Sequence, residues 1–229
     1  MSRRDELARN LAAVEQRIGS ACAAAGRARD EVTLVAVTKT WPASDAQLLG
    51  ELGVTDLAEN RDQEARAKAA VVTGVRWHFV GTLQTNKARS VAAYAHVVHS
   101  VDRPALVEAL DAGAARAGRE LDVLLQVSLD ADPARGGALP ADLAALADQV
   151  AGCDRLTLRG LMAVAPVGAE PAAAFARLQE LHGRLRAVHP GMTVLSAGMS
   201  GDLEPAIAAG ATHVRVGTAV LGHRATALR

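Results

Sequence analysis

Short apolar runs alternate with longer segments of helical periodicity along the whole chain. The runs are rich in valine and leucine and predict eight strands, over residues 32–37, 54–58, 75–80, 97–101, 121–128, 156–164, 192–196 and 213–216. Strands that alternate with helices are typical of repeated β–α units around a parallel sheet. Eight of them favour a single α/β domain of the (β/α)8 TIM-barrel type, because closing the sheet leaves no strand edge exposed.

An extra helix is predicted before the first strand. Its apolar residues fall at i, i+4, i+7, i+11 and i+15 and so share one stripe: Leu7, Leu11, Val14, Ile18 and Cys22. Ser44 is a candidate N-cap for a helix over 45–52, and Pro104 and Pro171 suit the first turns of two later helices. The segment 130–140 is rich in turn residues and is predicted to be a loop.

The composition fits one domain over residues 1–229, since half of the positions are apolar. Basic and acidic residues number 25 each, so the chain has no net field that would hold a nucleic acid or an anionic membrane. No apolar run approaches the roughly 18 residues that suggest a membrane span, and the first residues lack the apolar core of a secretory signal. We therefore expect a cytoplasmic protein. Cys22 and Cys153 stand in no metal-ligand spacing, so no metal site is predicted.

Polar and small residues follow the predicted strands at the end where such barrels carry their functional groups. Lys39 follows the first strand, and the loops after strands seven and eight cover 196–201 and 217–218. Barrels often bind phosphate in these last two loops through backbone N–H groups. The sequence therefore predicts a phosphate site, with ordinary glycine-rich turns as the alternative.

Lys39 places an amine on the same rim as this predicted phosphate site. A lysine amine that loses its solvation can condense with an aldehyde to form a Schiff base. From the residues alone, a solvated surface lysine remains the alternative. The pairing of an amine with a phosphate site on one rim favours a functional role for Lys39 over that alternative.

Six segments together resemble one family: 34–40 (LVAVTKT), 59–64 (ENRDQE), 77–87 (WHFVGTLQTNK), 98–102 (VHSVD), 158–162 (LRGLM) and 195–222. They resemble the pyridoxal phosphate homeostasis proteins, also called the YggS or PROSC family, whose barrel is similar to the N-terminal domain of alanine racemase. The chain departs from the family pattern at Leu57, Ala58, Ala197 and Leu221, which are apolar or small exchanges, and at Asp62, which changes the polarity.

The resemblance implies a cofactor site for pyridoxal 5′-phosphate. It implies that Lys39 carries the cofactor as a Schiff base and that Arg215 faces the pyridine nitrogen. Ser200, Gly217 and Thr218 would hold the phosphate, and Asn60, His78 and Met162 would lie near the cofactor. For these last three the residues leave alternatives open: a helix cap for Asn60, a hydrogen-bonded histidine in the barrel wall for His78, and core packing for Met162.

The function that the resemblance implies is binding, with buffering or delivery of pyridoxal phosphate inside the cell and no turnover. Apo forms of pyridoxal-phosphate enzymes are the expected recipients, and a monomer is expected. One alternative is a racemase-like enzyme, which would need a second acid or base opposite the lysine. The single tyrosine, Tyr94, is predicted to lie on the helix after strand three. Another alternative is a barrel enzyme that forms a lysine Schiff base without any cofactor.

Overall fold

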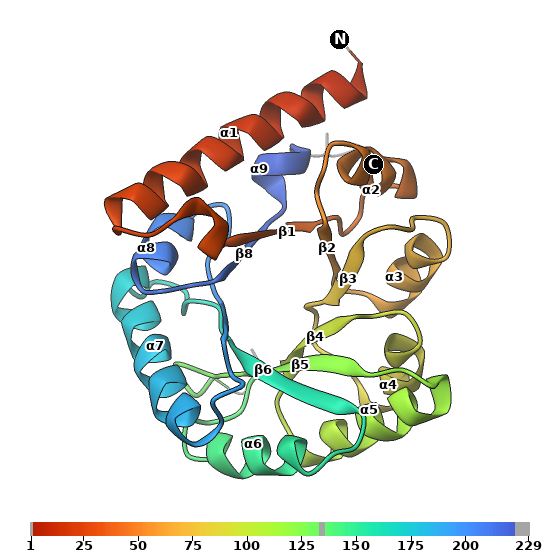
Figure 1. The fold of residues 1–229 in the computed structure, drawn as a ribbon, viewed down its shortest axis with the longest axis vertical. Coiled ribbons are helices and arrows are strands. Elements are labelled where there is room, and N and C mark those ends of the chain that lie inside the picture. The colour runs from red at the N-terminus through yellow and green to blue at the C-terminus, as the bar shows by residue number, and fades with distance from the viewer. Residues whose placement is uncertain (1, 133–135, 223–229) are drawn as a thin grey trace.

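Eight parallel strands close into a barrel in the order of the chain (Figure 1). The computed structural model describes residues 2–132 and 136–222. The strands are β1 (Thr33–Val37), β2 (Asp56–Glu59), β3 (Arg76–Phe79), β4 (Val97–Val101), β5 (Leu121–Gln126), β6 (Leu156–Met162), β7 (Val194–Ser196) and β8 (His213–Val216). Pairing of β8 with β1, which sets Val35 opposite Arg215, completes the ring. The predicted barrel is confirmed.

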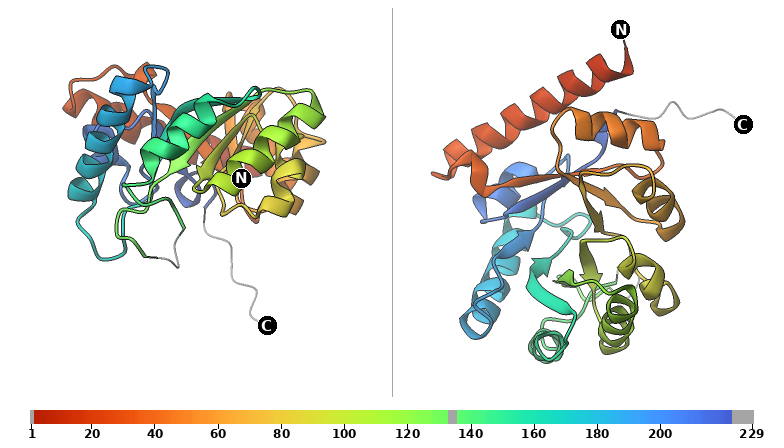
Figure 2. Two further views of the ribbon diagram at one scale, coloured as in Figure 1. Left: turned by 90° about the horizontal axis from the view of Figure 1, so that it is seen from below. Right: turned by 45° about the vertical axis from the view of Figure 1, so that its right-hand side comes forward.

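Helices surround the barrel on the outside (Figures 1 and 2). They are α1 (Arg3–Ala24), α2 (Ala43–Glu51), α3 (Asp62–Ala69), α4 (Thr85–Ala92), α5 (Pro104–Ala117), α6 (Leu143–Ala151), α7 (Pro171–Val188), α8 (Leu203–Ala208) and α9 (Thr218–Leu221), with a short 3-10 helix η1 (Arg29–Glu31) before β1. Within residues 2–132 and 136–222, no helix is both long and apolar enough to cross a membrane.

The N-terminal helix α1 lies across the outside of the barrel and contacts α8 and α9 (Figure 1). It buries the predicted stripe of Leu7, Val14, Ile18 and Cys22, while Leu11 is partly buried. Ser2 caps its start by accepting a hydrogen bond from the Asp5 amide at 3.1 Å. The predicted extra helix and its apolar stripe are therefore confirmed, and the structure adds that the helix packs on α8 and α9.

Strand residues alternate between the helix layer and the barrel interior. On β3, Trp77 and Phe79 belong to apolar clusters shared with the helices, whereas His78 points to the interior. Val214 on β8 also packs against the helix layer, and Arg215 lies inside. This two-residue period explains why polar residues interrupt otherwise apolar strands: they face the interior of the barrel.

The helix starts are only partly as predicted. Pro104 and Pro171 open α5 and α7, as expected for a residue without an N–H group. Ser44 is not an N-cap, because α2 already begins at Ala43 after Pro42. Pro42, whose ring fixes φ near −65°, precedes the first residue, and the helix begins two residues earlier than the Ser44 hydroxyl suggests. Of the predicted loop 130–140, residues 133–135 lie outside the described part of the chain.

Candidate functional site

A cavity of 360 Å³ opens at the carboxyl ends of β1, β7 and β8. Five of the eight residues predicted for the site line it: Lys39, Ser200, Arg215, Gly217 and Thr218. These residues come from three separate β–α loops or strand ends, so only closure of the barrel brings them together. The structure thus confirms that the amine and the small-residue loops share one rim, as the sequence indicates.

The strand end that presents Lys39 is anchored by buried polar groups. The Thr38 hydroxyl donates to Glu59 Oε1 at 2.6 Å, and Lys68 Nζ donates to the Thr38 carbonyl at 2.8 Å and pairs with Glu59. Burial raises the pKa of Glu59, although its hydrogen bonds with Lys68 and Thr38 oppose this. Glu59 and Lys68 were not among the residues predicted for the site, because nothing in their spacing along the sequence indicates that they contact Thr38.

The turn after Lys39 has an unusual backbone conformation. Thr40 has a φ of 68°, in the left-handed region that β-branched residues rarely adopt. Its amide donates to Glu64 Oε2 at 2.9 Å, which holds the turn against α3. Lys39 itself is exposed and has no hydrogen-bond or ion-pair partner among residues 2–132 and 136–222. Its amine is therefore free to react with a ligand.

Two loops that line the cavity together with Lys39 carry backbone N–H groups without acceptors. The amides of Ser200, Gly201 and Gly217 have no acceptor among the described residues, and Thr218 is the first residue of α9, where N–H groups lack helical partners. The Ser200 hydroxyl accepts from the Ala219 amide at 3.3 Å and so joins the two loops. Unpaired amides on two joined loops are suited to an anion.

Two glycines keep these loops close to the barrel. Gly198 has a φ of 89°, and a Cβ there would lie 2.7 Å from the Cβ of Ala206. A Cβ on Gly217 would lie 3.2 Å from the Val37 carbonyl oxygen, on the strand that precedes Lys39. Close approach to α8 and to β1 thus explains the glycines at these two positions, and the phosphate site at these loops stays a prediction.

Arg215 is the charged group in the floor of the cavity. Its Nη1 donates to Ser196 Oγ at 2.7 Å and its Nη2 donates to the Ala163 carbonyl at 2.9 Å. Burial lowers the pKa of Arg215 to about 10, and Asp202 opposes this shift. At that pKa the guanidinium is still a cation at neutral pH, although no carboxylate of the described chain forms an ion pair with it.

The other three predicted residues do not line this cavity. Both ring nitrogens of buried His78 are hydrogen-bonded inside the barrel, and Met162 packs in the interior with Val97 and Leu124. The Oδ1 atom of Asn60 is buried without a partner among the described groups. The alternative that Asn60 caps a helix is wrong, because α3 begins at Asp62 after Arg61, with no side-chain cap.

Other residues of the site carried little signal in the sequence. Trp41 and Met199 line the cavity, yet both read as ordinary apolar positions near a strand end. Arg17 donates from both Nη atoms to the Ser200 carbonyl at 3.1 Å, from the helix before the barrel. Arg17 and Ser200 are 183 residues apart in the sequence, so no local pattern predicts this contact.

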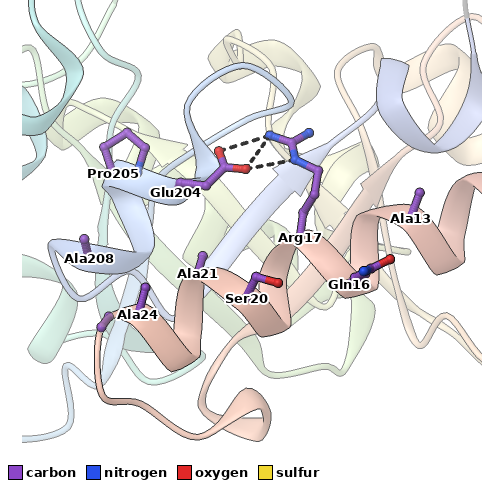
Figure 3. A pocket seen from close by; sticks show the side chains of 10 residues that line it. Ala13, Gln16, Arg17, Ser20, Ala21, Ala24, Glu204, Pro205 and Ala208 are labelled. Atoms are coloured by element: carbon purple, nitrogen blue, oxygen red, sulfur yellow. Dashed lines mark hydrogen bonds and ion pairs between the residues drawn. The ribbon is translucent and has the colours of Figure 1, made fainter.

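A larger groove of 780 Å³ lies between α1 and α8 (Figure 3). Five of its ten lining residues are alanines, and two others, Arg17 and Glu204, form an ion pair. Neither lysine nor histidine lines this groove. The chemistry predicted from the sequence therefore belongs to the smaller cavity at Lys39.

Comparison with known proteins agrees with this geometry. Residues 4–225 match the model of the alanine racemase N-terminal domain family. A pyridoxal phosphate homeostasis protein of Mycobacterium tuberculosis is 44% identical over 97% of this chain and 94% of its own. One of Pseudomonas aeruginosa is 44% identical over 95% of this chain and 96% of its own.

A solved structure shares both the fold and much of the sequence. PipY of Synechococcus elongatus, solved with PLP bound, is 37% identical and superposes with a TM-score of 0.83, over 94% of this chain and all of that one. Full-length identity at this level, together with the family model, assigns the relationship. The chain therefore belongs to the alanine racemase N-terminal domain family and, within it, to the pyridoxal phosphate homeostasis proteins.

Proposed function

We propose that this protein binds pyridoxal 5′-phosphate in the cavity at Lys39 and buffers or delivers the cofactor in the cell, without turnover of its own. The observation that carries the proposal is that the unpartnered Lys39 amine and two loops with unpaired backbone amides line the same cavity. An amine and a group of anion-binding amides in one small cavity match a phosphorylated aldehyde.

The residues present fit the group that the family implies. A volume of 360 Å³ is within the range of about 300–1,000 Å³ for small-molecule pockets. The Lys39 amine would condense with the aldehyde and release one water, and Ser200, Gly217 and Thr218 would hold the phosphate. When bound, the cofactor supplies a reactive aldehyde and an aromatic ring that can accept electrons.

Arg215 supports holding the cofactor over strong catalysis. A guanidinium remains charged at neutral pH, and a cation beside the pyridine nitrogen opposes protonation of that nitrogen. An unprotonated ring withdraws electrons less strongly than one paired with a carboxylate. The relatives' names, which refer to homeostasis, support the same choice.

Tyr94 does not supply the second acid or base that the racemase-like alternative needs. Tyr94 was predicted to lie on the helix after β3, but it lies in the turn two residues past the end of that helix, α4. It does not line the cavity. Burial is the main cause that raises the pKa of Tyr94. A phenol that is harder to ionise and remote from Lys39 is not suited to move a proton there.

The proposal extends to context that the sequence suggested. The protein would act in the cytoplasm as a monomer, with apo forms of pyridoxal-phosphate enzymes as recipients. Contacts of Asn60, His78 and Met162 with the cofactor stay a prediction, since these three lie behind the cavity wall.

The test compares absorbance spectra of the purified protein with added pyridoxal phosphate for wild type, Lys39→Ala and Lys87→Ala. The sequence has three lysines, of which Lys68 is buried and paired and Lys87 is exposed on α4, so Lys87 is the matched control. We expect a Schiff-base band in wild type and Lys87→Ala and none in Lys39→Ala.

Borohydride reduction followed by peptide mapping should then place the label on Lys39. A colourless wild-type protein that takes up no cofactor would contradict the proposal and favour the cofactor-free barrel enzyme. Racemisation of an amino acid at an ordinary enzymatic rate, lost in Lys39→Ala, would replace the carrier by the racemase-like alternative.

A further inference from the structure

Polar side chains form a continuous chain of contacts through the inside of the barrel, behind the cavity wall. The contacts join, in order, Asp56 on β2, His78 on β3, His99 on β4, Ser196 on β7 and Arg215 on β8. The four distances are 2.8, 2.8, 3.0 and 2.7 Å. Every member is at most 5% exposed, so water does not compete for these bonds.

The two ends of this chain fix the direction of its two terminal hydrogen bonds. A guanidinium has donors only and an ionised carboxylate has acceptors only. Burial opposes ionisation of Asp56, but hydrogen bonds from His78 and Thr55 outweigh it, so the pKa of Asp56 is lowered and the group is an anion. Arg215 therefore donates to Ser196 at one end, and Asp56 accepts from His78 at the other.

One arrangement with a single proton on each ring satisfies all of the interior members. Ser196 Oγ accepts from Arg215 and donates its proton to His99 Nδ1; His99 Nε2–H donates to His78 Nδ1; and His78 Nε2–H donates to Asp56. In this arrangement each histidine carries its ring proton on Nε2. The opposite neutral tautomer would aim a bare His78 nitrogen at a carboxylate, and a charged histidine would place a second buried cation near Arg215. Burial, the largest cause, keeps the pKa of His99 well below its usual value.

We propose that Asp56, His78, His99 and Ser196 are positioning residues that act as one relay, which holds the guanidinium of Arg215 in the cavity and so sets the affinity for the ring of the bound ligand. This rests on the proposed function in taking pyridoxal phosphate as that ligand. Arg215 lines the cavity, whereas Ser196, His99, His78 and Asp56 do not. They act on the ligand through Arg215 alone, and their influence should not extend to the phosphate end, which is built from the loops at Ser200 and Gly217.

The first test needs no ligand. Nitrogen-15 NMR of the ligand-free protein at pH 7 reports the protonation state of each imidazole. We expect both His78 and His99 to be neutral, with the proton on Nε2. A charged ring, or a proton on Nδ1 of His99, would overturn the relay whatever the protein binds.

The second test separates the relay from general packing. Ser196→Ala removes the hydroxyl that joins Arg215 to His99, and Ser100→Ala removes a neighbouring buried hydroxyl that has no partner among the described residues. We expect Ser196→Ala to weaken pyridoxal phosphate binding about tenfold, as for loss of one hydrogen bond to a charged group, and Ser100→Ala to leave it unchanged. Competition by inorganic phosphate should be the same in all three proteins.

A remote variant tests whether the chain acts as a unit. Asp56→Asn removes the anion at the far end while keeping the size of the side chain, and it should also weaken binding. The double variant Asp56→Asn with Ser196→Ala should be no weaker than the weaker single variant, because both cut the same relay. Additive losses, or an equal loss of phosphate binding, would show a merely structural role. Failure of wild type to bind pyridoxal phosphate would refute the proposed function, and the NMR result would still decide the relay.

Discussion

At the scale of single residues, the site depends on places where no side chain beyond a hydrogen fits. A Cβ on Gly81, which follows β3, would lie 2.1 Å from the carbonyl oxygen of Asn60. Such a contact cannot be relieved by rotating a side chain, since both partners are backbone. The loop after β2, which carries Asn60, is thereby held against the loop after β3.

Gly81→Ala should therefore lower the free energy of unfolding by about 2 kcal/mol or more, because the two loops must move apart. The matched control is Gly19→Ala in α1, where a Cβ meets nothing within 4 Å and removal of a helical glycine should raise stability by up to about 1 kcal/mol. Urea denaturation of the three proteins checks both signs. Equal stability of Gly81→Ala and wild type would mean that the loops yield without cost.

At the scale of elements, α1 holds the segments after β7 and β8 through side-chain hydrogen bonds. Arg3, Asn10 and Arg17 follow one another at intervals of seven residues and therefore share one face of the helix. They donate to the backbone carbonyls of Leu221, Val220 and Ser200, respectively. The ion pair of Arg17 with Glu204 on α8 holds the guanidinium in place (Figure 3).

Arg17→Ala should weaken binding of pyridoxal phosphate and of inorganic phosphate alike, by about threefold to tenfold, because the Ser200 loop loses its support. Binding of pyridoxal, which has no phosphate, should not change. Arg27→Ala is the control, since Arg27 also donates to two backbone carbonyls, those of Ile207 and Ala211, away from the cavity. Isothermal titration calorimetry measures all of these, and a parallel loss in Arg27→Ala would indicate general loosening of the fold.

At the scale of the whole molecule, the polar interior makes stability depend on pH. Burial is the largest cause that lowers the pKa of His99, and it lowers that of His213 to about 4. In the unfolded chain both histidines titrate near 6.5. Below that pH the unfolded chain binds more protons than the folded protein, so stability is fully present above pH 6.5 and is lost toward pH 4. Burial raises the pKa of Glu59. Near that pKa the folded protein binds more protons than the unfolded chain, so Glu59 opposes the loss of stability at lower pH.

The free energy of unfolding should thus fall between pH 6.5 and 4, by up to roughly 1.4 kcal/mol per pH unit for each histidine that stays neutral in the folded protein. His213→Gln should reduce this slope by about one proton, since the amide does not titrate. Thermal or urea unfolding at a series of pH values measures the slope directly. An identical slope in wild type and His213→Gln would show that His213 is not the group responsible.

The sequence by itself determined the architecture and the rim of the site. The two-residue and 3.6-residue periods are local, so eight strands, their helices and α1 could be read from the chain. Once the barrel is assumed, Lys39 and the loops at Ser200 and Gly217 must share one end, because the carboxyl ends of parallel strands meet there. Where the predicted elements were wrong, the error was local: α2 begins at Ala43 after Pro42, and Ser44 is not its N-cap.

Only the tertiary structure decided which inward side chains meet. The sequence left open whether His78 lies beside the cofactor or is hydrogen-bonded in the barrel wall, and the structure pairs it with Asp56 and His99 in the barrel interior. His99 and Ser196 are 97 residues apart, and Arg17 and Ser200 are 183 residues apart. The stagger of the closed sheet and the packing of α1 set these contacts. Periodicity tells which face a residue lies on, but only the closed register gives its height in the barrel and hence its partner.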